Sequence, residues 1–233
     1  MNNLLLLSNS TNAGMGYLEH AWQAVLPALD GVTELVFVPY SLADHDAYTQ
    51  KVREAFAPHG ITVKGVHEDG DPVATVRQAQ AIFVGGGNTF RLLDRLKQER
   101  LIVELHNHVA AGKLYMGASA GTNVAAPTIR TTNDMPIIFP EGFDALGLVP
   151  FQINCHYLDA DPNSTHAGET RELRLTEFHE ENTTPVVAIR EGVWIRVHGG
   201  VTEIGGAAVN TQYGPALLFT PGEAPREISG VLG

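Results

Sequence analysis

Short runs of apolar residues alternate with amphipathic stretches through the first half of the chain. The apolar runs are continuous rather than alternating, as in strands that are buried on both faces of a sheet. They predict strands at Leu4–Leu7, 35–38, 61–66, Ala81–Val84 and 113–116. The stretches between them repeat apolar residues at helical spacing and predict helices at 18–29, 48–56, 72–79, 89–97 and 101–110. Strands that each lead into a helix indicate the α/β class, with a mostly parallel sheet flanked by helices.

The second half of the chain is less regular. Residues 131–150 hold three prolines and two glycines without a clear period, which predicts a long loop of the kind that often carries functional residues. A helix is expected over 168–179. After Pro185, strands such as Val186–Ile189 and 193–197 alternate with glycine-rich turns and predict a small antiparallel extension. Because no repeat or linker is visible, residues 1–233 are expected to form one domain.

Composition and charge narrow the range of partners. Hydrophobic residues make up 44% of the 233 positions and charged residues 18%, as in an ordinary globular protein. Fifteen basic against 26 acidic residues give a net charge of −11, which disfavours nucleic acid and anionic membrane surfaces. The short apolar start lacks an early basic residue, and no apolar run approaches membrane length, so we expect a cytoplasmic protein. The lone Cys155 fits a reducing compartment and excludes a cysteine-based zinc site.

The strongest chemical signal is the segment from Gly117 to Gly121, which reads Gly-Ala-Ser-Ala-Gly. It follows a predicted strand and precedes a stretch, 121–126, that can open a helix, and G-x-S-x-G in that setting is a sharp turn that exposes a serine nucleophile. The amide of Ala120 then lies at a helix start, where it can donate to an oxyanion. The alternative is a small-residue turn with only a packing role, and we favour Ser119 as the nucleophile.

A serine nucleophile needs a base, and the chain has ten histidines. Those at 20, 106 and 108 fall in predicted helices, where surface or packing roles are typical. His156 instead ends an apolar run that would deliver it to the carboxyl edge of the sheet, where α/β proteins place their sites. His156 is therefore the first candidate and His166 the second. No H-x-x-x-H or H-E-x-x-H pattern occurs, and we expect neither a metal nor an organic cofactor.

The acid that orients the histidine has two candidates, between which spacing does not decide. Asp134 lies in the long loop, and Glu191 lies in a turn between two predicted strands. A second oxyanion donor is expected at the amide of Gly87, in a glycine-rich loop that fits neither a dinucleotide fingerprint nor a P-loop. Cys155 adjoins His156, but neighbours in a strand face opposite sides, so we interpret it as a buried structural thiol.

Several segments together resemble the peptidase E family, the cytoplasmic α-aspartyl dipeptidases of bacteria. The resemblance covers nearly the whole chain, through LLLLSNS at 4–10, VGGGNTF at 84–90, the GASAG turn, PTIRTTNDMP at 127–136, GFDAL at 142–146, QIN at 152–154 and GETRE at 168–172. One departure is Cys155, where close relatives are expected to have proline. The resemblance implies a fold related to class I glutamine amidotransferases, which is flavodoxin-like, with serine in place of their cysteine.

The resemblance also implies roles for individual residues. Ser119 would be the nucleophile and His156 the base, with Glu191 preferred over Asp134 as the third triad member. Aspartate specificity requires a cation, for which we choose Arg171, with Arg130 in reserve. Asn88 is expected to bind the substrate, and Glu169 or Asp134 is expected to bind the free amine of the substrate.

Three functions are compatible with these observations. The first is a serine dipeptidase for Asp-X dipeptides, acting as a monomer or small homo-oligomer on a small-molecule substrate. The second is a related serine hydrolase of the cyanophycin or isoaspartyl type, acting on β-linked or polymeric aspartyl substrates. The third is a non-enzymatic small-molecule sensor on the same fold. Because a sensor would be expected to lack at least one triad element, the complete set of candidates favours the enzymes.

Overall fold

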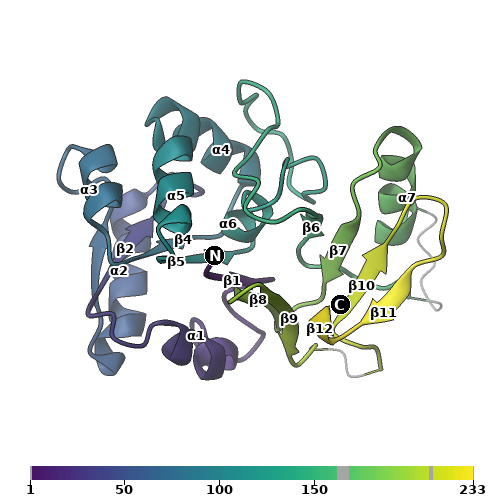
Figure 1. Ribbon diagram of the computed structural model, residues 1–233, viewed down its shortest axis with the longest axis horizontal. Helices are drawn as coiled ribbons and strands as arrows, with labels where there is room; N and C mark the ends of the chain where they lie inside the picture. The colour runs from purple at the N-terminus through teal and green to yellow at the C-terminus, as the bar shows by residue number, and fades with distance from the viewer. Residues whose placement is uncertain (1, 162–167, 210–211, 233) are drawn as a thin grey trace.

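An eight-stranded sheet forms the centre of the molecule (Figure 1). The structure is a computed structural model that describes residues 2–161, 168–209 and 212–232. The strand order is β12-β9-β8-β1-β5-β4-β2-β3. Five strands run parallel: β1 (Leu4–Leu7), β5 (Leu114–Ala118), β4 (Ala81–Val84), β2 (Glu34–Val38) and β3 (Thr62–Gly65). Three antiparallel strands extend the sheet beyond β1: β8 (Val193–His198), β9 (Val201–Gly206) and β12 (Gly230–Leu232).

Helices cover both faces of the parallel strands because successive apolar side chains point to opposite sides. Leu4 and Leu6 face one cluster, and Leu5 and Leu7 face the other. The first cluster includes residues of α3 (Pro72–Gln78), α4 (Thr89–Gln98), α5 (Leu101–Ala110) and α6 (Ala120–Asn123). The second includes residues of the short 3-10 turn η1 (Glu19–Ala21), α1 (Trp22–Ala28) and α2 (His45–Phe56), the last followed by η2 (Ala57–His59).

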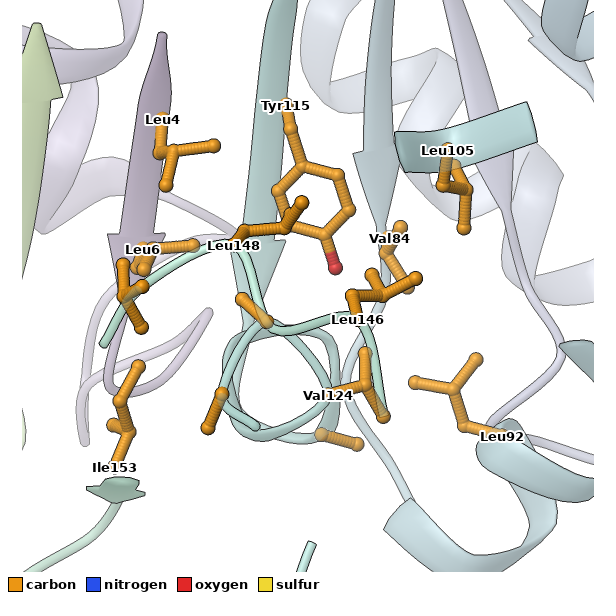
Figure 2. Packing of buried hydrophobic residues seen from close by; sticks show 14 of the residues in the cluster. Leu4, Leu6, Val84, Leu92, Leu105, Tyr115, Val124, Leu146, Leu148 and Ile153 are labelled. Atoms are coloured by element: carbon orange, nitrogen blue, oxygen red, sulfur yellow. The ribbon is translucent and has the colours of Figure 1, made fainter. Parts of the chain in front are cut away.

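The first cluster also fixes the turn that carries the site. Figure 2 shows Tyr115 of β5 in this layer, beside Leu146 and Leu148 of the long loop. The buried Tyr115 hydroxyl donates to the carbonyl oxygen of Gly121 at 2.6 Å. A buried hydroxyl without a partner would cost free energy, so this bond ties α6 to the sheet.

A second, four-stranded sheet stands at one end of the molecule, right in Figure 1. Its order is β11 (Arg226–Ile228), β10 (Ala216–Phe219), β7 (Val186–Ile189) and β6 (Gln152–Asn154). The helix α7 (Arg171–Glu181) packs Leu175 and Phe178 into a small cluster with side chains of β7 and β10. In the described parts of the chain, no helix combines the length and apolar composition that crossing a bilayer requires.

The predicted fold class, a mostly parallel α/β sheet with a small antiparallel part, is confirmed. The strands after Pro185 differ from the expectation in one respect, because they divide between the two sheets rather than forming a single extension. The helix expected over 18–29 is interrupted, with η1 preceding α1. The helix expected to start at 168 starts at Arg171, where the Thr170 side chain accepts from the amide of Leu173.

A buried histidine on α5 makes stability depend on pH. The side chain of His108 is 5% exposed, and its Nε2 lies 2.9 Å from the carbonyl oxygen of Leu114. Burial, with a smaller contribution from Lys113, lowers its pKa from 6.5 to about 4. Between these values the unfolded chain binds a proton that the folded chain does not, so stability falls as pH drops.

We therefore expect the folded protein to lose about 2 kcal/mol through His108 alone between about pH 7.5 and pH 5. Urea denaturation of the wild type and of His108→Gln at both pH values measures this contribution, since glutamine can still donate to Leu114. The wild type should lose that much more stability than the variant. Equal losses in the two proteins would contradict the assignment.

Candidate active site

Ser119 lies at a sharp turn between a strand and a helix. β5 ends at Ala118 and α6 begins at Ala120, so Ser119 alone connects them. Its φ is 51° and its ψ −109°, a strained conformation for a residue with a side chain, and strain of this kind is typical of functional turns. Its amide donates to the carbonyl oxygen of Leu7 at the end of β1. The strand–turn–helix arrangement predicted from the sequence is present, although α6 is only one turn long.

The glycines on either side of Ser119 allow this turn. A Cβ on Gly121 would lie 2.1 Å from the carbonyl oxygen of Val84 on the neighbouring strand. A Cβ on Gly117 would lie 2.5 Å from the carbonyl oxygen of Gly121. Both contacts are with backbone, which cannot move aside without disturbing the sheet, so the turn requires glycine at both ends of the motif.

Two hydrogen bonds join Ser119, His156 and Glu191 in a line. His156 Nε2 lies 2.8 Å from Ser119 Oγ, and His156 Nδ1 lies 2.9 Å from Glu191 Oε1. With a neutral imidazole, Nδ1–H donates to the carboxylate and Nε2 accepts from the hydroxyl. This is the order of contacts by which a histidine can activate a serine.

His156 is held by a buried serine that sequence reasoning missed. The backbone amide of His156 donates to Ser8 Oγ at 2.9 Å, and Ser8 Oγ donates to the carbonyl oxygen of Ile189 at 3.0 Å. Ser8 is fully buried directly after β1. One hydroxyl therefore connects the ends of β1 and β7 to the segment that carries His156. The signal in the sequence was a polar residue that directly follows a strand predicted to be buried.

Glu191 lies in the turn between β7 and β8, and its neighbour Arg190 anchors that turn. The side chain of Arg190 is 4% exposed, and its guanidinium contacts both carboxylate oxygens of Asp159 at 2.7 Å. It also contacts both carboxylate oxygens of Glu227 at 2.8 and 3.0 Å. Because Asp159 follows His156 by three residues, this paired cation links the segment carrying the histidine to the turn carrying its acid.

The side chain of Asp134 forms its hydrogen bonds with Thr89, the first residue of α4, rather than with His156. Its Oδ2 accepts from the amide of Thr89 at 2.7 Å and from Thr89 Oγ1 at 2.5 Å. Asn88 caps the same helix start, with Oδ1 accepting from the amide of Arg91 and Nδ2 donating to the carbonyl oxygen of Met135. The two side chains thus join the long loop to α4, and among the described residues only Glu191 forms a hydrogen bond with His156 Nδ1.

Cys155 is a buried thiol beside the turn. Its Sγ lies 3.6 Å from the carbonyl oxygen of Ser119. Burial raises the pKa of the thiol well above its usual value, and the nearby Asp134 carboxylate adds to this rise. The thiol therefore stays protonated, as a structural cysteine does. The alternation of side chains along a strand, expected from the sequence, does not apply to Cys155 and His156, because β6 ends at Asn154 and neither residue lies in a strand.

A cavity of about 490 Å³ opens at Ser119. It lies where the segments after β1, β2, β4 and β5 meet, the edge at which open α/β sheets bind ligands. Gly87 lines it, while Ala120 is buried behind Ser119 as the first residue of α6. An amide at that position has no acceptor within its helix. The lining residues are Asn9, Ser10, Thr11, Tyr17, Leu42, Asp44, Ala47, Tyr48, Lys51, Gly86, Gly87, Ser119 and His156.

The candidate cations lie elsewhere. Arg171, at the start of α7, lines a separate cavity of about 430 Å³ with Asp159, Glu169 and Arg174 among others. Glu169 pairs with Arg174 at 3.4 Å. Arg130 is exposed and lies over the ring of Phe143. His166, the second candidate base, lies outside the described residues. Among the described residues, no three metal-binding side chains come together.

Comparison with known proteins identifies the family. The model of peptidase family S51 matches residues 4–205. A Streptomyces coelicolor protein named "Peptidase E" is 59% identical over 227 residues, which cover 97% of this chain and 91% of that protein. A Drosophila melanogaster protein named "Probable alpha-aspartyl dipeptidase" is 51% identical over 200 residues, covering 84% of this chain and 83% of that protein.

A solved structure gives the same fold. A protein from Listeria monocytogenes EGD-e superposes with a TM-score of 0.67 at 24% identity, covering 89% of this chain and 100% of that one. The family model and the two relatives confirm the resemblance found in the sequence over most of the chain. This protein belongs to peptidase family S51.

Proposed function

We propose that this protein is a serine dipeptidase that hydrolyses dipeptides with N-terminal aspartate through an acyl-enzyme intermediate. The observation that carries the proposal is the line of hydrogen bonds from Glu191 through His156 to Ser119, at the mouth of an open cavity. The family membership and the name of the Drosophila relative support the reaction and the aspartyl substrate.

In the first half of the reaction, Ser119 Oγ attacks the carbonyl carbon of the peptide bond. His156 Nε2 takes the hydroxyl proton as the new C–O bond forms, and Glu191 stabilises the resulting imidazolium through Nδ1–H. The electron pair of the carbonyl moves to its oxygen. We assign the amides of Gly87 and Ala120 to that oxyanion, because Gly87 lines the cavity and Ala120 begins α6.

Collapse of the tetrahedral intermediate breaks the C–N bond. His156 Nε2 gives its proton to the leaving amine, and the second amino acid departs with a neutral amino group. The aspartyl group remains as an ester on Ser119. A water molecule then gives a proton to His156 and attacks the ester, releasing aspartate and returning the proton to Ser119.

The aspartyl side chain needs a cation, and Arg171 is our choice. Its guanidinium is half-buried and forms no ion pair with any described residue. Burial, and then the charge of Arg174, lower the pKa of Arg171, so an incoming carboxylate would stabilise its charged form. We assign Glu169 or Asp134 to the substrate's free amine, and we keep Asn88 as a residue that binds substrate.

Location and assembly belong to the same proposal. We place the enzyme in the cytoplasm, where a buried and protonated Cys155 remains reduced. We expect it to act as a monomer or small homo-oligomer. Its substrate is a small peptide rather than nucleic acid, as the net charge of −11 indicates.

Hydrolysis of four dipeptides tests the proposal: Asp-Leu, Asn-Leu, Glu-Leu and β-Asp-Leu. A site built around the aspartate carboxylate should give kcat/KM for Asp-Leu at least about 10³-fold above the other three. Preference for β-Asp-Leu would instead support an isoaspartyl hydrolase. No cleavage of any of them by folded protein would support the sensor and overturn the proposal.

A further inference from the structure

The cavity at Ser119 extends toward α2, in a direction that the reaction described above does not use. Its lining includes Ala47, Tyr48 and Lys51 of α2, with Tyr17 from the segment after β1. Leu42, 39% exposed, also lines the cavity. A substrate at Ser119 therefore has room for a further group between the serine and α2.

Lys51 supplies a positive charge to this wall. Its Nζ lies over the ring of Tyr17, 5.0 Å from the ring centroid, and it forms no ion pair with any described residue. Apart from the phenols of Tyr17 and Tyr48, the other titratable side chains that line the cavity are His156 and Asp44. Asp44 is already bound, because it caps α2 by accepting from the amide of Ala47 at 2.9 Å. Among the residues that the structure describes, Lys51 thus brings to the cavity an ammonium group without an ion-pair partner, in a protein with a net charge of −11.

The position of this charge decides which part of a peptide it meets. The histidine of a serine hydrolase gives its proton to the leaving amine, so the leaving group lies on the histidine's side of the serine. His156 lines the same cavity as Lys51. Asp134 of the long loop and Asn88, the N-cap of α4, do not line it and are left to the acyl side. The amino acid released from the peptide therefore occupies the space that leads to Lys51.

We propose that Lys51 binds the C-terminal carboxylate of the dipeptide, and that this contact makes the enzyme prefer dipeptides to longer or amidated substrates. The inference rests on the proposed function, because it assumes an aspartyl acyl group on the other side of Ser119. In a dipeptide the free carboxylate belongs to the leaving residue itself. In a longer peptide an uncharged amide takes its place and gains nothing from the ammonium group.

The two carboxylates of an Asp-X dipeptide then have separate partners. Arg171 receives the aspartyl side chain, and Lys51 receives the terminal carboxylate. Leu42 and Ala47 line the same cavity as Ser119 and Lys51 and offer apolar contacts to the second side chain. A site of this form selects strongly at the first position and weakly at the second.

A pair of substrates isolates this contact: Asp-Leu and Asp-Leu-amide, which differ only in the terminal charge. A hydrogen bond to a charged group is worth about 10- to 100-fold in binding, so the wild type should favour Asp-Leu by that factor in kcat/KM. Lys51→Met and Lys51→Gln should lose this preference through a higher KM for Asp-Leu, with kcat/KM for the amide unchanged. Lys51→Arg should retain part of it.

Lys64→Met is the matched control, because Lys64 lies on β3, pairs with Asp69 and does not line the cavity. This variant should leave kcat/KM for both substrates unchanged. An equal loss on both substrates in Lys51→Met, or no loss on either, would overturn the assignment of Lys51. If the wild type cleaved neither substrate, the proposed function itself would be overturned. That result can be told apart from the two outcomes for Lys51→Met.

Discussion

Ser119→Ala should lower kcat for Asp-Leu by at least about 10⁴-fold while KM stays near its wild-type value. The reason is that the hydroxyl makes no contact that substrate binding requires, whereas no acyl-enzyme can form without it. The oxyanion amides and the cavity remain, so binding persists and chemistry stops. Steady-state kinetics on the purified variant give both constants.

Ser10→Ala is the control for this variant, because Ser10 lines the same cavity and is not part of the hydrogen-bonded line. It should keep most of the wild-type activity. Wild-type kcat in Ser119→Ala would show that another group attacks the peptide bond. In that case the strained turn at Ser119 would have no catalytic role.

Glu191→Gln should lower kcat by about 10³- to 10⁴-fold, and Asp134→Asn by far less. Glutamine can occupy the same space as Glu191, but it has no charge to stabilise the imidazolium and can offer His156 Nδ1 the wrong hydrogen-bonding group. Asp134 accepts from Thr89 instead, and the oxygen of an asparagine can accept one of those bonds. Measuring kcat for the two variants side by side distinguishes the two acids.

The reverse result, with Asp134→Asn as the damaging variant, would place Asp134 in the triad and leave Glu191 with a structural role. Thermal unfolding of both variants separates loss of catalysis from loss of fold. A fall in kcat with an unchanged unfolding temperature assigns the effect to the reaction.

The parallel core could be predicted because its strands are buried on both faces. Such strands have continuous runs of apolar residues in the sequence, as at Leu4–Leu7 and Ala81–Val84, and each is followed by a helix with clear periodicity. The second sheet could not be predicted. β6 and β11 have three residues each, and the partners of β6 and β7 are set by contacts between distant segments. Local sequence does not specify such pairing.

The candidate site also has a part that could be predicted from the sequence and a part that could not. Ser119 and His156 could be found because each follows an apolar run that ends at the carboxyl edge of a sheet. The choice between Glu191 and Asp134 could not be made, because it depends on which turn lies beside His156 in space. Lys51 and Ser8 were missed for related reasons. An exposed lysine on a helix and a serine after a strand are common, and only the fold places one in the cavity and the other under His156.

Trapping the acyl-enzyme tests the central claim most directly. The wild type, quenched in acid during turnover of Asp-Leu and then digested, should yield a peptide that carries an aspartyl ester on Ser119, detected by mass spectrometry. Glu-Leu under the same conditions should leave the peptide unmodified. An aspartyl group on another residue, or turnover of Asp-Leu with no covalent adduct even after rapid quenching, would contradict the account.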